Sequence, residues 1–291
     1  MRSLMKLYVF RLRHSVSSLV EIIISASIGL IYGVIVGIVA INTKGTLVKG
    51  DYIAKMLVGG DILSLNIQYP VITLIIAIFL TTFLSQDFRN GTFRNMIVRG
   101  KSRGEIFASY YLCTIAWSHI IYLLYFATFS LGMLVGLGNY SAANLNVMNF
   151  LTSFGLNQVL HLFYITFIFF LIFALKAGGF SIPCFILVSM GLYIVSIILI
   201  SVPAMNPGMS SSNQEMLYLV NTFLPYGQGQ IIGSMNFSLL YGTPSAGSSV
   251  IYTPTRDFSS INLTVIAGLP LITSVGLYFL GRHIFIKRDM K

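Results

Sequence analysis

Long apolar stretches alternate with short polar connections along the whole chain. Six of them cover residues 19–41, 66–85, 108–136, 150–175, 180–202 and 262–285. Each is long enough to cross a membrane as a helix, which takes about 20 apolar residues. The apolar side chains run continuously and do not alternate with polar ones, as they would in a transmembrane β-barrel. We therefore predict an all-α membrane protein in which residues 1–291 form a single transmembrane domain of six helices.

The composition supports this class and excludes a soluble one. Hydrophobic residues make up 56% of the 291 positions and charged residues only 9%. A soluble domain carries about 25% charged residues, because its surface must be solvated. The two cysteines, Cys113 and Cys184, both lie in apolar stretches, so no disulfide framework is indicated.

The few charges are placed asymmetrically. Of the 18 Lys and Arg residues, 14 fall on one side of the six-helix topology, in the N-terminal segment, residues 86–107, residues 176–179 and the C-terminal tail. Cytoplasmic connections of membrane proteins are enriched in Lys and Arg. We therefore predict that both termini are cytoplasmic. The net charge of +10 follows from this topology, so we expect no nucleic-acid partner.

The first 18 residues have an amphipathic pattern. A helix over 1–18 places Arg2, Lys6 and Arg13 on one face and Leu4, Tyr8 and Leu12 roughly opposite. Arg11 breaks this pattern. We interpret the segment as an interfacial helix at the inner membrane surface. The alternative is a basic flank without a helical role.

A long outer segment, residues 203–261, precedes the last apolar stretch. It is rich in Pro, Gly and Ser but contains apolar runs at 215–224 and 230–240. These runs are too short to cross a membrane, so we expect re-entrant or interfacial short helices.

Candidate catalytic motifs do not match their patterns. Gly100-Lys101-Ser102 lacks the first glycine of a phosphate-binding loop, since Asn95 stands there. His119 and His161 have no acidic residue in their own apolar stretches. We interpret both as neutral side chains hydrogen-bonded between helices, with substrate or proton contact as the alternative. We predict no enzyme, no metal site and no cofactor in this chain.

Acidic residues fall in connections or at the ends of the apolar stretches, whereas ion-coupled carriers place carboxylates near mid-membrane. Glu21 comes closest to the membrane interior. Either it pairs with a nearby arginine, or it acts as a gate or as a contact in an intracellular network.

The connection over residues 86–107 has the pattern of a short helix between two turns. Gly91 permits a sharp turn because it has no Cβ. Thr92 is placed to N-cap a helix from Phe93 to Val98, which Gly100 would end. Ser102 is placed to cap the next helix.

The string D-F-R-N-G-T-F-R-N-x-I-V-x-G-x-S-R-x-E-I-F over 87–107 resembles the first cytoplasmic loop of type-2 ABC transporter permeases. The closest likeness is to the Gram-positive subset associated with peptide or bacteriocin export and immunity. The six apolar stretches, the sequence Leu-Pro-Tyr-Gly-Gln at 224–228 and the exit Phe285-Ile-Lys-Arg-Asp289 extend this resemblance over the chain.

The resemblance implies a permease subunit in a bacterial plasma membrane. Such permeases pair as homodimers or heterodimers, and each docks a cytoplasmic ATPase that binds ATP and Mg. The loop would be the coupling helix, with Phe93 and Met96 as its apolar anchors. The implied partner-binding residues are Asp87, Arg89, Gly91, Thr92, Phe93, Arg94, Met96 and Arg103. Residues 213–233 would be outer re-entrant helices, with Pro225, Gly227 and Gln228 in their motif.

Substrate would pass between two permease chains along the second and fifth apolar stretches. The Phe-rich and Tyr-rich stretches favour an amphipathic or hydrophobic peptide, with lipid or a hydrophobic drug as alternatives. A different class, an ion-coupled carrier or channel for a hydrophobic solute, remains the competing hypothesis.

Overall fold

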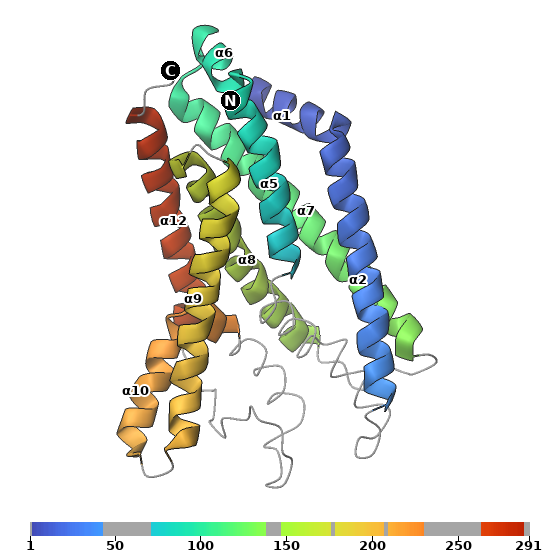
Figure 1. Ribbon diagram of the computed structural model, residues 1–291, viewed down its shortest axis with the longest axis vertical. Coiled ribbons are helices and arrows are strands. Elements are labelled where there is room, and N and C mark those ends of the chain that lie inside the picture. Colours follow the sequence, from blue (N-terminus) through green and yellow to red (C-terminus); the bar gives the residue numbers. More distant parts are fainter. Residues whose placement is uncertain are drawn as a thin grey trace.

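The computed structural model describes residues 2–42, 71–137, 147–175, 178–206, 209–229 and 263–287, and it is helical with no strand within those ranges (Figure 1). The helices are α1 (Arg2–His14), α2 (Val16–Asn42), α5 (Val71–Arg89), α6 (Thr92–Val98), α7 (Arg103–Leu137), α8 (Val147–Leu175), α9 (Gly178–Met205), α10 (Ser211–Thr222) and α12 (Leu263–Lys287).

The prediction of six long apolar helices is confirmed. Within the described ranges, six helices are long and apolar enough to cross a membrane, namely α2, α5, α7, α8, α9 and α12. Most of their ends lie within a few residues of the predicted boundaries, but α7 starts earlier than predicted. It begins at Arg103 because Ser102 caps it there. The length and composition of these helices are those of a multi-pass membrane protein.

The six long helices run side by side, and α1 crosses them at one end of the bundle (Figure 1). The short helix α6 lies at this same end, whereas α10 lies at the opposite end (Figure 1). Helix α5 is the most enclosed of the six long helices, and α9 is the most exposed. Among the described residues, short helices thus lie at both ends of the bundle, α1 and α6 at one end and α10 at the other.

Among the described helices, α2 and α7 share the most extensive contact, and glycines permit their close approach. A Cβ built at Gly132 would lie 2.2 Å from the backbone oxygen of Leu30, and one at Gly29 would lie 2.4 Å from Thr128 Oγ1. Neither position has room for a larger side chain. Small residues at such crossings let helix backbones pack closely in a membrane, where lipid offers no hydrophobic driving force for association.

A cluster of phenylalanines closes the end of the bundle that carries α6. Phe173 of α8 lies 5.0 Å from Phe107 of α7, 5.1 Å from Phe285 of α12 and 5.7 Å from Phe93 of α6, measured between ring centroids. These are ordinary distances for aromatic pairs. The cluster fixes α6 against three of the long helices.

Candidate functional site

The connection between α5 and α7 is a short helix held between two glycine turns. Gly91 has φ 64° and Gly100 has φ 80°, both in the left-handed region that favours glycine. The Asn95 backbone N–H donates to the Gly91 carbonyl at 2.9 Å, so Gly91 itself occupies the N-cap position. The prediction that Thr92 caps the helix is therefore off by one residue, because the turn at Gly91 already closes the first hydrogen-bonded ring.

The end of α6 and the start of α7 are also defined by local hydrogen bonds. Gly100 N–H donates to the Ile97 carbonyl at 2.9 Å, and Lys101 N–H donates to the Met96 carbonyl at 3.1 Å. This pair of bonds is the Schellman motif that ends helices at a glycine. Ser102 Oγ accepts from the Glu105 N–H at 3.2 Å. The predicted glycine stop and serine cap are both confirmed.

Phe93 and Met96 are buried within the chain, with exposed fractions of 1% and 7%. The Phe93 ring packs against Phe88 at 4.6 Å and Tyr110 at 4.9 Å. The prediction that these two side chains offer an apolar surface to a partner is wrong, because α6 turns its apolar side toward the phenylalanine cluster. They anchor the helix to its own bundle instead.

The outer surface of α6 is formed by the other side of the helix. Its exposed side chains are Arg94, Asn95, Val98 and Arg99, and Val98 is 79% exposed. Arg89, at the end of α5, is exposed as well. We call Arg94, Asn95, Val98 and Arg99 the outer face of α6.

Arg103 is only partly exposed and donates from Nη1 to the Ile286 carbonyl at 2.8 Å, so it joins α7 to the end of α12.

Asp87 is fully buried near the end of α5 and forms an ion pair with Arg11 of α1. The hydroxyls of Tyr110 and Thr92 also approach its carboxylate. The Arg11 guanidinium lies over the Phe83 ring, 5.0 Å from its centroid. This ion pair explains why Arg11 departs from the basic face of α1. Asp87 was expected to bind a partner protein, but its carboxylate is enclosed and its partner lies in the same chain.

The predicted amphipathic face of α1 is confirmed. Leu4, Tyr8 and Leu12 are buried. The Tyr8 hydroxyl and Thr114 Oγ1 are 3.1 Å apart, and the Tyr8 ring meets Tyr110 edge to face at 4.8 Å. Burial raises the pKa of the Tyr8 phenol above its ordinary value, so the group stays neutral. Through these contacts and the ion pair, α1 is attached to both α5 and α7.

Glu21 lies inside the apolar span Val16–Ile35 and is 3% exposed. The indole N–H of Trp117 donates to its Oε2 at 2.7 Å, whereas Oε1 has no hydrogen-bond partner among the described residues. The interpretation as an arginine-paired residue is wrong, because Trp117 is the partner. The buried hydroxyls of Ser18 and Ser25 lie on the same helix at three- and four-residue spacing.

The two histidines of α7 and α8 meet in the bundle. Their ring centroids are 5.2 Å apart, and His161 also lies 4.6 Å from Tyr122. His119 Nδ1 is 2.9 Å from the carbonyl of Ile115 in its own helix, rather than bonded to a neighbouring helix. Asn157 donates to the Tyr122 hydroxyl beside them. The described part of the chain contains no group of three His, Cys, Asp or Glu side chains that could hold a metal ion.

The segment over 211–229, which contains the predicted Pro225, Gly227 and Gln228 motif, packs against α9. Helix α10 and a further helical turn at 225–229 fall where short helices were predicted. Asn221 accepts a hydrogen bond from Ser196 of α9, and Tyr226 meets Tyr193 edge to face at 4.5 Å. A Cβ at Gly227 would lie 2.0 Å from the Asn221 carbonyl, so only glycine fits there. Pro225 begins the turn, and Gln228 is buried behind it. The predicted second run, 230–240, lies outside the described residues.

No family model matches the chain, and no curated protein matches it.

Proposed function

We propose that the chain is the transmembrane permease subunit of an ATP-driven exporter, coupled to a separate cytoplasmic ATPase and forming the substrate path with a second permease chain. One observation carries the proposal. The outer face of α6 is exposed at the end of the bundle, while Phe93 and Met96 fix the same helix to the long helices. An exposed surface on a rigidly braced helix is what a motor protein needs in order to move a bundle.

The bracing distinguishes α6 from an ordinary connecting loop. A conformational change in one protein moves another only through an element that makes different contacts in the two states and transmits them without bending. Helix α6 is held by glycine turns at both ends and by the phenylalanine cluster underneath. A force on its outer face would therefore reach α5, α7, α8 and α12 together.

In this proposal the ATPase docks on the outer face of α6. Phe93 and Met96, which the sequence suggested as the contacts, are buried and take no part in docking. Exposed ion pairs from Arg94 and Arg99 to acidic groups of an ATPase would each contribute about 0–1 kcal/mol. Val98 would be the apolar centre, because side chains that become fully desolvated dominate interface energetics. ATP and Mg would be bound by the ATPase, and both chain termini would lie on the side of that ATPase.

Exposed apolar side chains of the bundle support the proposal of an apolar cargo and of a second permease chain. Helix α9 exposes Phe180, Leu187 and Ile198 among others. Such residues suit contact with lipid, with a second permease chain or with an apolar cargo. We propose an amphipathic or hydrophobic peptide as cargo, moving between the two chains along α5 and α9.

A matched pair of substitutions tests the coupling surface. Val98→Asp places a charge on the outer face of α6, and Val16→Asp places one on an equally exposed valine at the start of α2, since the two are 79% and 78% exposed. The chain is purified together with a candidate cytoplasmic ATPase, and complex formation and ATP-dependent peptide transport into vesicles are measured. Val98→Asp should abolish both, and Val16→Asp should leave both within about twofold. Unchanged complex formation and transport in a well-folded Val98→Asp chain would refute the proposal.

The competing function, an ion-coupled carrier, is favoured by Glu21 alone. A buried carboxylate in an apolar span, with one oxygen that has no partner among the described residues, is the kind of group that carriers use to bind a proton or cation. In that case an ionophore that collapses the ion gradient would stop transport while ATP is still present. Under the exporter proposal, the same treatment leaves ATP-dependent transport unchanged.

A further inference from the structure

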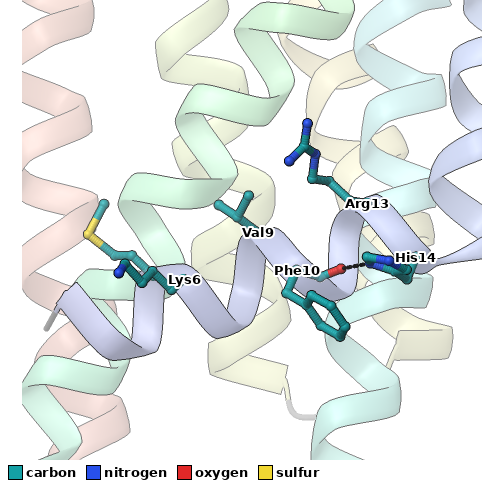
Figure 2. Close-up of a pocket in the computed structure, with 6 residues that line it drawn as sticks. Lys6, Val9, Phe10, Arg13 and His14 are labelled. Atoms are coloured by element: carbon teal, nitrogen blue, oxygen red, sulfur yellow. Dashed lines mark hydrogen bonds between the residues drawn. The ribbon is translucent and has the colours of Figure 1, made fainter.

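The face of α1 that points away from the bundle forms a shallow open recess. Its volume is about 410 Å³, and it is lined by Met5, Lys6, Val9, Phe10, Arg13 and His14 (Figure 2). Figure 2 shows Val9 and Arg13 along one edge of the helix and Phe10 and His14 along the other. The His14 ring is fixed there by a 2.9 Å hydrogen bond between Nδ1 and the Phe10 carbonyl.

The recess carries positive charge that the described chain does not neutralise. Lys6 and Arg13 are exposed and seven residues apart, which places them on one stripe of the helix about 10 Å from each other. Helix α1 contains no acidic residue. Asp87 is already paired with Arg11, which lies on the opposite side of α1. Among the described residues, no carboxylate pairs with Lys6 or Arg13.

The same face exposes large apolar side chains beside the two cations. Val9 is 45% exposed and Phe10 59%. A helix surface that combines cations with exposed Phe and Val suits the boundary between lipid headgroups and acyl chains. The position of α1 agrees with this, because the helix crosses the end of the bundle and α2 enters the apolar span directly after it (Figure 1).

We propose that this recess binds the phosphate headgroup of an anionic phospholipid in the leaflet that borders α1. Lys6 and Arg13 contact the phosphate oxygens, and Val9 and Phe10 contact the first methylenes of the acyl chains. Phosphate groups of a peptide or a nucleic acid would meet the cations equally well, but they would leave the apolar side chains in water. The site does not depend on the transport function, since it needs neither an ATPase nor a cargo.

Lipid retention by the full chain tests the site. The purified chain in detergent is incubated with equal parts of phosphatidylglycerol and phosphatidylcholine, and the lipids that stay bound are measured by native mass spectrometry. The wild-type chain should retain phosphatidylglycerol in preference. Each cation near an anionic surface contributes a factor of about five, so Lys6→Gln with Arg13→Gln should lower the preference by roughly 25-fold. Arg13→Gln alone should lower it by about fivefold.

The matched control removes two charges from the same end of the bundle but outside the recess. Arg94→Gln with Arg99→Gln should keep the wild-type preference. An equal loss in this control would overturn the proposal, because it would assign the preference to net charge alone. Displacement of the bound lipid by millimolar inorganic phosphate would also overturn it, since the recess would then be a site for any small anion. An unchanged preference for phosphatidylglycerol in the variant Lys6→Gln with Arg13→Gln would also overturn the proposal.

Discussion

Replacing Arg11 by methionine should destabilise the protein strongly, although Arg11 is partly exposed. The substitution leaves the Asp87 carboxylate, which is fully buried, without its ion-pair partner. Removing one member of a buried ion pair costs about 3–5 kcal/mol, because the remaining charge is desolvated and unpaired. The Arg11 side chain is 27% exposed, so water partly screens the pair and the lower figure, about 3 kcal/mol, is expected.

The assay is thermal unfolding of the full chain in detergent, followed by circular dichroism. Each kcal/mol shifts the midpoint of a large domain by about 2–4 °C, so Arg11→Met should lower it by roughly 6–12 °C. Arg13→Met is the matched control, because Arg13 is an exposed arginine on the same helix. An exposed substitution changes stability by about 0.5 kcal/mol or less, so the control should shift the midpoint by only one or two degrees.

A double-mutant cycle separates the ion pair from the packing of the Arg11 stem over Phe83. Asp87→Asn together with Arg11→Met removes both charges, so part of the lost stability should return. The coupling free energy between the two sites should be about 2 kcal/mol, within the range measured for contacting residues. Additive effects of the two substitutions, or an Arg11→Met shift no larger than that of Arg13→Met, would refute the reasoning.

Three further outcomes follow from the packing. Gly132→Ala should destabilise the chain by about 2 kcal/mol or more, because its Cβ would overlap the Leu30 backbone of α2. Gly155→Ala is the control, because a Cβ there meets open space, and it should be neutral or slightly stabilising. The midpoints of thermal unfolding distinguish the two variants. Gly91→Ala should cost about 1–2 kcal/mol through its left-handed backbone alone, again read from the midpoint, since nothing lies within 4 Å of its Cβ. Trp117 is the single tryptophan, so Glu21→Leu should shift its fluorescence to shorter wavelength by removing the carboxylate from its N–H; an unchanged spectrum would contradict the contact.

The sequence predicts those features that depend only on residues close to one another along the chain. The six apolar helices follow from the length of uninterrupted apolar stretches. The stop at Gly100 and the cap at Ser102 follow from local turn chemistry, and the structure contains both. The buried face of α1 follows from helical spacing. None of these requires knowledge of which helices are adjacent.

The direction of the α6 side chains could not be predicted in this way. Phe93 is buried because Phe173 and Phe285, from α8 and α12, lie beside it. Apolar residues in a short basic loop fit an exposed interface and a buried contact equally well until those neighbours are known. Arg11 is a different case. Its place on the apolar side of α1 was visible in the sequence, and a cation there indicates a buried carboxylate, although the pattern does not identify Asp87.

The Arg11–Asp87 pair gives α1 a role in both proposals. On one side α1 is attached to the end of α5, next to the turn that positions α6. On the other side it presents Lys6 and Arg13. If docking of an ATPase moves α6 and α1 together, and lipid binds the recess more tightly in one of the two positions of α1, the affinity of the recess for lipid changes on docking. Coupling of two binding events is reciprocal, so anionic lipid must alter the affinity for the ATPase by the same factor. Breaking the ion pair with Arg11→Met together with Asp87→Asn should therefore remove the effect of lipid on docking while leaving each binding event measurable alone.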